Sequence, residues 1–300
     1  MTQEIVNEKE QSCCAPSCCD GSASVEVKTV PEGDEQVREM VREGYGQIAQ
    51  QGGGCCGGGS EWDYAKSIGY DEDELGAVPE GANLGLGCGN PSAIASIKPG
   101  EVVLDLGSGA GFDAFLAARQ VGEEGRVIGI DMTPEMLARS RENAFKAGVS
   151  RYVEFREGLI EKMPVVDDSV DVIISNCVIN LSPDKDAVFQ EAFRVLKPGG
   201  RVAISDVVLS EPLDPDIMDM AAGYIGCVSG ALVEEEYIGK LEAAGFTDIT
   251  WTRDSAAVLF ATTGDPVVAD AMKKVGSEKL EAAAKNLWSY KITGTKPCVN

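Results

Sequence analysis

The sequence predicts an α/β protein built on a doubly wound, parallel sheet. Between Val102 and Val208, short apolar segments of strand length alternate with longer amphipathic segments of helical period. A glycine-rich turn joins the first strand of this pattern to the first helix, and an acid ends the second strand. Strands that alternate with helices are connected by crossovers, which makes the sheet parallel. Ligands of such sheets bind outside the carboxyl ends of the strands.

The first strand and the turn after it carry the strongest signal in the chain. The apolar run Val102–Leu104 ends in Asp105, and the GSGAG turn Gly107–Gly111 follows before a helix begins. The second strand, Val127–Ile130, ends on Asp131. This layout places a nucleotide-like cofactor at the N-terminus of the helix and its ribose hydroxyls on the acid that ends the second strand.

The spacing of the glycines distinguishes between two cofactor classes. Dinucleotide-binding turns have the form G-x-G-x-x-G, with the third glycine where backbone, helix and pyrophosphate crowd together. S-adenosylmethionine has no phosphate, so its turn only has to admit an amino-acid moiety and a ribose. Asp105, at the tip of the strand, would face the ammonium group of that cofactor. The turn therefore favours S-adenosylmethionine over NAD.

The later elements of the sheet follow in the same alternation. A threonine cap, a first-turn proline and a terminal glycine delimit a helix from Thr133 to Gly148. The other predicted elements are the strands Val153–Arg156 and Val170–Ile174, a helix from Ser182, a turn at Lys197–Gly200 and a strand over Arg201–Val208. Cys177 comes shortly after the fourth strand, so we expect it at the same edge of the sheet as Gly107 and Asp131.

Five regions describe the predicted organisation of the chain. They are a flexible thiol-rich tail (1–30), an N-terminal helix with cysteine-bearing loops (31–100), the cofactor-binding core (101–210), an inserted substrate-covering segment with closing strands (211–264) and a small helical C-terminal extension (265–300). The closing strands are predicted as an antiparallel pair, Phe246–Arg253 with Ala256–Thr262, and a helix is predicted over Ala269–Ser289.

Composition excludes several classes of partner. A hydrophobic content of 44% over 300 residues is enough for a substantial core. The formal net charge of −23 disfavours binding to nucleic acid and to anionic membranes, and tolerates neutral or cationic ligands. No apolar run approaches the ~18 residues of a membrane span. The N-terminus lacks the features of a signal peptide, so we expect a cytoplasmic protein.

The chain has ten cysteines and no histidine, which limits the metal-ligating and catalytic groups that it can supply. In a reducing compartment, cysteines act as ligands or redox groups more often than as disulfides. A Cys/His zinc site and acid–base catalysis by imidazole are both excluded. Soft thiolate ligands select soft, thiophilic elements.

Seven segments together resemble the arsenite S-adenosylmethionine methyltransferase family. They are LGLGCGNP around Cys88, LDLGSGAGFD, GIDMTPEML, SNCVINLSPDK around Cys177, LKPGGR, ISDVV, and YIGCVSGAL around Cys227. The resemblance runs from roughly Gly33 to Gly264, and it is specific because three separate cysteine contexts agree. It implies a Rossmann-like methyltransferase sheet with an arsenic-binding segment inserted over 211–264.

The resemblance also implies site residues and a detoxifying methyl transfer to arsenic. Cys88, Cys177 and Cys227 would be the thiolates that hold As(III). The implied cofactor contacts are Asp105, Gly107, Ser108, Gly109, Gly111, Asp131, Met132, Ile160, Glu161 and Asn176. Arsenite is neutral near pH 7, so an acidic protein does not repel it. A lone pair on thiolate-bound arsenic would attack the methyl group directly, which needs no general base and leaves positioning as the main source of catalysis.

A redox step would accompany each methyl transfer. In the family, a cysteine upstream of the glycine turn closes a disulfide that thioredoxin or a small thiol reopens. The doublet Cys55–Cys56 occupies that position, and either member would fit the role. The N-terminal cluster Cys13–Cys19 is expected to be a dispensable tail, the alternative being a collector of arsenite. Two other functions share this fold: a quinone- or sterol-type C-methyltransferase, and a non-catalytic arsenic-binding protein.

Overall fold

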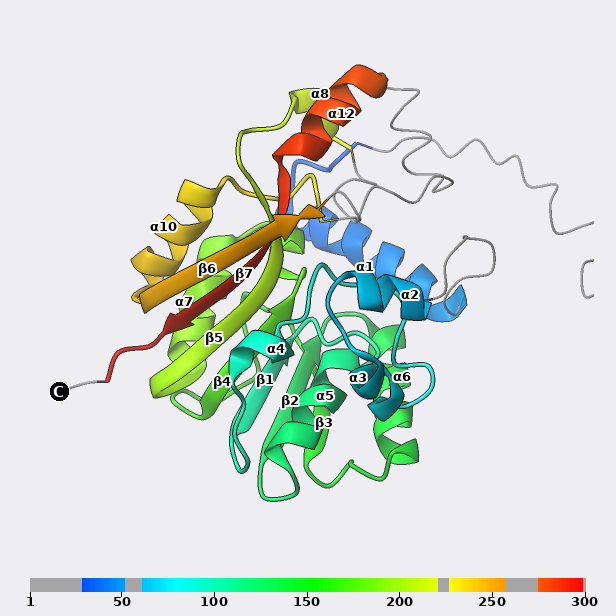
Figure 1. Cartoon of the computed structure of the whole chain (residues 1–300), viewed down its shortest axis with the longest axis vertical. Helices are drawn as coiled ribbons and strands as arrows, with labels where there is room; N and C mark the ends of the chain where they lie inside the picture. Colours follow the sequence, from blue (N-terminus) through cyan, green and yellow to red (C-terminus); the bar gives the residue numbers. More distant parts are fainter. Residues whose placement is uncertain (1–28, 52–60, 221–226, 257–274, 299–300) are drawn as a thin grey trace, which may run out of the picture.

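The computed structural model describes residues 29–51, 61–220, 227–256 and 275–298. These residues form a seven-stranded sheet with the order β3-β2-β1-β4-β5-β7-β6 (Figure 1). Five strands are parallel to one another: β1 Val102–Leu106, β2 Arg126–Asp131, β3 Val153–Glu157, β4 Val170–Asn176 and β5 Leu196–Leu209. The order of the chain reverses between β1 and β4, which is where ligands of doubly wound sheets bind. The predicted α/β class is confirmed.

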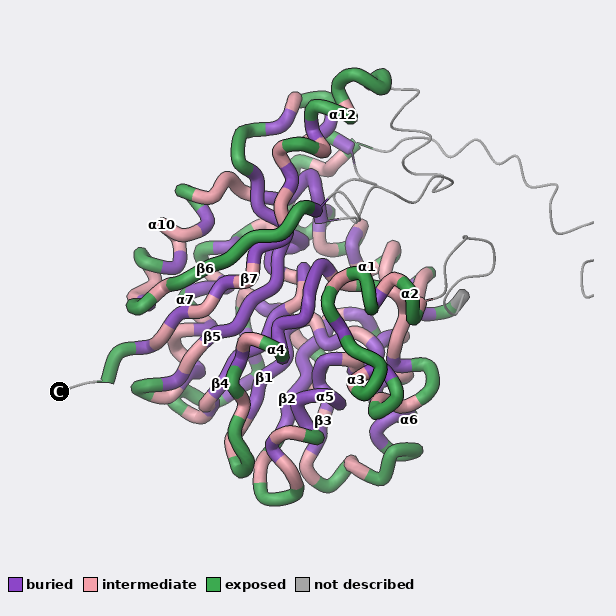
Figure 2. The backbone as a smooth tube through the Cα atoms, viewed as in Figure 1, coloured by how far each residue is buried: buried purple, intermediate pink, exposed green. Residues whose placement is uncertain are grey.

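Alternation along the strands divides the core between the two faces of the sheet. Leu104, Ile128 and Ile173 pack with apolar residues of α7 (Lys185–Val195) and α10 (Glu234–Ala244). Their neighbours, such as Val103 and Val127, pack with residues of α5 (Phe112–Val121) and α6 (Pro134–Lys146). Successive side chains of a strand point to opposite faces, so a strand buried on both faces is apolar throughout. Figure 2 shows β1, β2 and β4 largely buried between these helical layers, whereas β6 at the edge of the sheet is exposed.

The N-terminal helices lie at the carboxyl edge of the sheet. Helix α1 (Asp34–Gln51) packs against α6, and its Val37 and Val41 belong to an apolar cluster that also contains Cys177. The predicted helix over Gly33–Gln51 is thus confirmed. The shorter elements of the described chain are α2 Glu61–Ser67, α3 Glu72–Ala77, α4 Ser92–Ala95, the 3-10 turn η2 Ile179–Leu181, α8 Pro215–Met218 and α12 Ser277–Asn286.

The closing strands differ from the prediction. Strand β6 (Thr247–Ser255) pairs antiparallel with β7, which spans Leu287–Thr295 and pairs antiparallel with β5 on its other side. Apart from Ala256, the predicted partner Ala256–Thr262 lies outside the described residues. The predicted helix is confirmed over Ser277–Asn286 and wrong from Leu287 onward, so the C-terminal region contributes a strand of the main sheet.

A change of side-chain type explains that difference. The helical period of α12 ends at Asn286, and the following WSYKIT run is rich in aromatic and β-branched residues that favour strands. Pairing on both edges then satisfies the backbone of β7. The predicted turn at Lys197–Gly200 falls inside the bounds of β5, where the pairing with β4 shifts register and Gly199 has φ 81°.

Candidate functional site

The glycine turn lies between β1 and α5, and the backbone conformation at its three glycines disfavours any residue with a side chain. Gly107, Gly109 and Gly111 have φ values of 62°, 51° and 96°, in the left-handed region that side chains disfavour. A Cβ added at Gly107 would also collide with Val178, and one at Gly111 would lie 2.9 Å from the ring of Phe155. The turn therefore keeps an open backbone surface at the N-terminus of α5, next to the carboxyl end of β1.

Two buried polar atoms beside this turn lack a protein partner. Among the described residues, no hydrogen bond reaches Oδ2 of Asp105 or Oγ of Ser108. Burial raises the pKa of Asp105 well above its usual range, and the nearby carboxylates of Asp113 and Asp131 raise it further. A bound ammonium group would supply the missing charge and hydrogen bond to Asp105. These atoms fit a cofactor with a cationic amino-acid moiety, such as S-adenosylmethionine.

Asp131, at the end of β2, ties the turn to the second strand. Its Oδ2 accepts a hydrogen bond from the backbone N–H of Gly109 at 2.8 Å, and its Oδ1 accepts one from Thr133 at 2.8 Å. Burial raises the pKa of this carboxyl, while the backbone hydrogen bonds from Thr133 and Gly109 oppose that rise. Each carboxylate oxygen retains a second lone pair, so the group is still able to accept from ribose hydroxyls.

The loop after β3 holds two more of the predicted cofactor contacts. Ile160 is buried in the apolar core. Glu161 accepts hydrogen bonds from Arg38 Nε at 3.1 Å and from Ser182 Oγ at 2.8 Å. Met132, after β2, is partly buried against the cluster that contains the cysteines. Arg38 was absent from the sequence prediction, because nothing in the pattern of α1 indicates a partner 123 residues away.

Asn176, another of the predicted cofactor contacts, is hydrogen-bonded to several parts of the chain. Its Oδ1 accepts the backbone N–H of Cys88 at 2.8 Å. Its Nδ2 lies 2.8 Å from the carbonyl oxygen of Gly89, 3.0 Å from Tyr70 Oη and 3.0 Å from Asp113 Oδ2. Tyr70 donates to the other oxygen of Asp113 at 2.6 Å. The amide of Asn176 therefore joins the end of β4 to the Cys88 loop and to the start of α5.

Burial dominates the electrostatics of this network. It raises the pKa of Asp113 to about 6, and the hydrogen bonds from Tyr70 and Asn176 limit the rise. It also raises the pKa of Tyr70, where the charge of Asp113 adds to the effect. Asp113 comes two residues after Gly111, the last glycine of the turn, in the LDLGSGAGFD segment. That position was the only sequence signal for its role, and it gave no indication of Tyr70.

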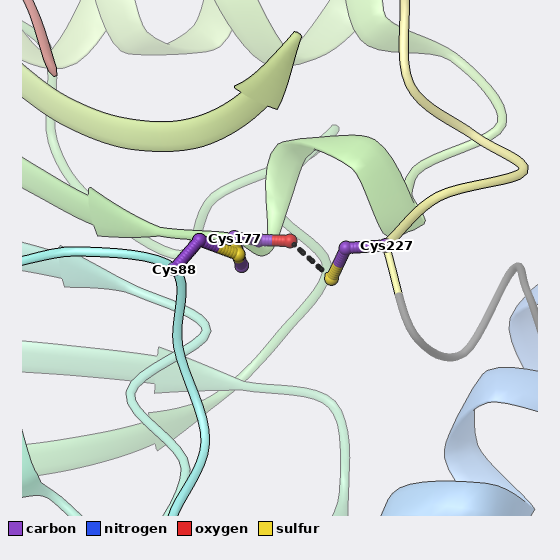
Figure 3. Close-up of side chains that lie close together, drawn as sticks. All are labelled: Cys88, Cys177 and Cys227. Carbon is purple, nitrogen blue, oxygen red and sulfur yellow. Dashed lines mark hydrogen bonds between the residues drawn. A yellow bond between two sulfur atoms is a disulfide. The ribbon is translucent and has the colours of Figure 1, made fainter. Parts of the chain in front are cut away.

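Three cysteines from different parts of the chain meet at this edge of the sheet (Figure 3). The sulfur atoms of Cys88, Cys177 and Cys227 all lie within 4.8 Å of one another, and all three residues are buried. Cys88 and Cys177 form a disulfide with their Cα atoms 5.7 Å apart, and Cys227 is a free thiol. The structure thus brings together the three cysteines singled out in the sequence.

Two of these cysteines have an unusual backbone. Cys177 has φ 61° and Cys227 has φ 64°, both in the left-handed region that non-glycine residues rarely adopt. The N–H of Cys177 donates to the carbonyl of Ser205 at 2.8 Å, and the Cys227 thiol donates to the carbonyl of Cys177 at 3.1 Å. Strained backbone of this kind concentrates at functional sites, where surrounding contacts maintain it.

The surroundings of Cys227 favour the protonated form of its thiol. Burial raises its pKa strongly and the charge of Asp206 adds to this, whereas a hydrogen bond with Tyr45 and the charge of Lys185 act in the opposite direction. Lys185 is itself buried and donates to the carbonyl of Ser182 at 2.8 Å. Burial, with a contribution from Cys227, raises the pKa of Tyr64 to about 12.

Other predicted residues fall outside this site. Cys55, Cys56 and the Cys13–Cys19 cluster lie outside the described residues. Cys298 is exposed near the C-terminus. Over the described part of the chain, no helix combines the length and the apolar character needed to cross a membrane.

Comparisons with known proteins match this chain to methyltransferases. Residues 97–252 match the model of a methyltransferase domain. An arsenite methyltransferase of Halobacterium salinarum is 51% identical over 226 residues, which cover 71% of this chain and 58% of that protein. An arsenite methyltransferase of Aquipseudomonas alcaligenes is 35% identical over 274 residues, covering 87% of this chain and 74% of that protein. The chain thus spans little more than half the length of the first of these relatives.

A solved structure extends the likeness to three dimensions. The arsenic(III) S-adenosylmethionine methyltransferase of Chlamydomonas reinhardtii superposes with a TM-score of 0.56 at 31% sequence identity. The match covers 79% of this chain and 74% of that one.

Proposed function

The chain belongs to the arsenite S-adenosylmethionine methyltransferase family, and we propose that it transfers methyl groups from S-adenosylmethionine to trivalent arsenic, first to arsenite and then to methylarsenite. The observation that carries this proposal is the convergence of Cys88, Cys177 and Cys227, whose buried sulfur atoms lie within 4.8 Å of one another. Cys177 directly follows β4, and the next residue, Val178, lies against Gly107 of the glycine turn that would hold the cofactor.

Arsenite would bind by exchange of its hydroxyl groups for thiolates. Each thiol of the reduced cluster displaces one hydroxyl, and the thiol proton leaves with that hydroxyl as water. The exchange needs no external base, which suits the protonated state of Cys227 and the absence of histidine from the chain. The Cys88–Cys177 disulfide has to be reduced first, because a disulfide sulfur is not a thiolate ligand.

The residues around the turn would bind and orient the cofactor. When bound, S-adenosylmethionine supplies a methyl group carried on a sulfonium. Asp105 would pair with the ammonium group, and Asp131 would accept from the ribose hydroxyls. Three sulfur ligands leave the arsenic lone pair directed away from the cluster, so the protein's main contribution is to align donor and acceptor.

Methyl transfer leaves the arsenic pentavalent, and a second transfer requires its reduction to the trivalent state. Two thiols can supply both electrons by closing a disulfide, with loss of their protons. We propose Cys55 or Cys56 as one partner, and thioredoxin or a small thiol of the cytoplasm as the reductant that reopens the disulfide.

The test is to incubate the reduced protein with arsenite and S-adenosylmethionine that carries a labelled methyl group. We expect the label in methylarsenicals separated by chromatography, and loss of the product after the thiols are alkylated. Label transfer to a quinone or sterol acceptor that resists alkylation would favour the C-methyltransferase alternative. Arsenite binding without label transfer would favour a non-catalytic binding protein.

A further inference from the structure

Cys88 lies on a loop, and side chains of other elements form hydrogen bonds with the backbone on both sides of it. Tyr64 of α2 donates to the carbonyl of the preceding Gly87 at 2.7 Å. Asn176, at the end of β4, accepts the N–H of Cys88 at 2.8 Å. Ser289 of β7 donates from Oγ to the carbonyl of Cys88 at 2.6 Å. Side chains from three distant elements therefore fix the peptide groups on both sides of this cysteine.

Ser289 is the most remote of these partners. It lies 201 residues from Cys88 in the sequence, and it is buried on the strand that pairs with β5. The loop rests directly on the sheet at this point. A Cβ added at Gly89 would lie 2.9 Å from Oγ of Ser205 and 3.6 Å from Oγ of Ser289. The absence of a side chain at Gly89 lets the loop lie directly on Ser205 of β5, the strand that pairs with the strand carrying Ser289.

We propose that Ser289 is a positioning residue for Cys88, and that it is needed for binding of arsenite but not of methylarsenite. This inference rests on the proposed function. Arsenite offers three exchangeable positions and would use all three thiolates. Methylarsenite offers two, which Cys177 and Cys227 can fill. The backbones of those two cysteines bond to Ser205 and Asn180 rather than to Ser289.

Of the three clustered cysteines, only Cys88 would lose a hydrogen bond when the Ser289 hydroxyl is removed. The carbonyl of Cys88 would lose its donor while remaining buried, and a buried acceptor without a partner disfavours that position of the loop. The loop would then shift toward solvent, and the third sulfur would move out of reach of arsenic. Two thiolates would remain in place.

The test is to titrate the fully reduced, full-length protein with arsenite and separately with methylarsenite, and to measure the bound arsenic after rapid filtration. Three variants are compared with wild type. Ser289→Ala removes the hydroxyl and Ser289→Thr retains it. Gly89→Ala adds a Cβ that would collide with Ser205 and push the loop away from the sheet. Ser205→Ala is the matched control. It deletes a buried hydroxyl that has no hydrogen-bond partner among the described residues, and it retains the carbonyl that bonds to Cys177.

We expect Ser289→Ala and Gly89→Ala to raise the dissociation constant for arsenite about tenfold, the usual consequence of losing one buried hydrogen bond. Methylarsenite should bind within about twofold of wild type in both, and Ser289→Thr and Ser205→Ala should bind both ligands normally. Equal weakening of the two ligands, or unchanged arsenite binding, would overturn the inference. A wild-type protein that binds neither arsenical would instead refute the proposed function itself.

Discussion

Arg38 of α1 donates from Nε to Glu161 Oε1 at 3.1 Å, and this ion pair joins the N-terminal helix to the loop after β3. Both side chains are largely buried, with 16% and 9% of their surfaces exposed. The same oxygen of Glu161 accepts from Ser182 at 2.8 Å. Because Val37 and Val41 pack into the cluster that contains the cysteines, the pair fixes α1 over the edge where cofactor and arsenic are proposed to meet.

Substitution of Arg38 should therefore lower stability more than substitution of an exposed arginine. We expect Arg38→Gln to lower the free energy of unfolding by ~1–3 kcal/mol, between the values of exposed and fully buried ion pairs. Urea denaturation measures the change. Arg151→Gln is the control, because its pair with Glu123 is 72% and 69% exposed and should contribute less than ~1 kcal/mol. Equal losses in the two variants would show that Arg38 does not fix α1.

Asp131→Ala should weaken binding of S-adenosylmethionine by about 1.5–3 kcal/mol, since it removes a charged acceptor for the ribose hydroxyls. Arsenite binding should survive, because the cysteine cluster is formed by other loops. Calorimetric titration with the cofactor measures the effect. Glu157→Ala is a suitable control. Glu157 lies on β3 as the register partner of Asp131 on β2, and its side chain is exposed. An unchanged cofactor affinity in the Asp131 variant would remove this residue from the site.

Cys177→Ser and Cys227→Ser should each abolish methylation of both arsenite and methylarsenite. A serine hydroxyl is nearly isosteric with the thiol but far too weakly acidic to serve as a thiolate ligand. Cys88→Ser, or loss of both Cys55 and Cys56, should stop the first methylation and leave part of the second. The assay compares the two substrates across the variants. Near wild-type methylation of arsenite by Cys177→Ser would disprove the three-thiolate mechanism.

Deletion of residues 1–28 should leave folding and turnover at saturating arsenite nearly intact. The pairing of the following residues is retained, since Thr29 forms a bridge with Met220 and Val30 donates to the carbonyl of Asp219 at 3.1 Å. Thermal denaturation and the methylation assay together check this. A loss of most activity in a normally folded truncation would assign the Cys13–Cys19 cluster a part in the reaction cycle.

Asp206 should contribute a loss of stability as the pH rises from about 4 to about 7. Burial raises the pKa of Asp206 from 3.8 to about 7, against a lowering effect of the hydrogen bond from Tyr237. Between these two pH values the folded state holds a proton that the unfolded state has lost, so each rise in pH favours unfolding. Asp206→Asn removes this titration.

The measurement is the free energy of unfolding of Asp206→Asn and of wild type at several pH values between 4 and 8. We expect the stability of the variant relative to wild type to increase as the pH rises from about 4 to about 7, with the difference complete above pH ~7. Asp186→Asn is the control, because Asp186 is an exposed acid paired with Lys240. Parallel pH profiles of Asp206→Asn and wild type would contradict the raised pKa.

The sequence determined the local framework of this protein. The alternation of buried strands and amphipathic helices is a short-range pattern, so the class and the first five strands could be predicted. The GSGAG turn could be predicted as well, because its three positive φ values require glycine whatever the surroundings. The acids at the tips of β1 and β2 followed from their position after apolar runs.

Tertiary structure decided the contacts between distant segments. The meeting of Cys88, Cys177 and Cys227 depends on the order of the strands and on two left-handed cysteine backbones, neither of which has a periodic signature. The last strand was wrongly predicted because a pairing of β7 with both β5 and β6 is not visible in local propensity. Arg38–Glu161 and Ser289–Cys88 span 123 and 201 residues, and only the packed sheet brings such pairs together.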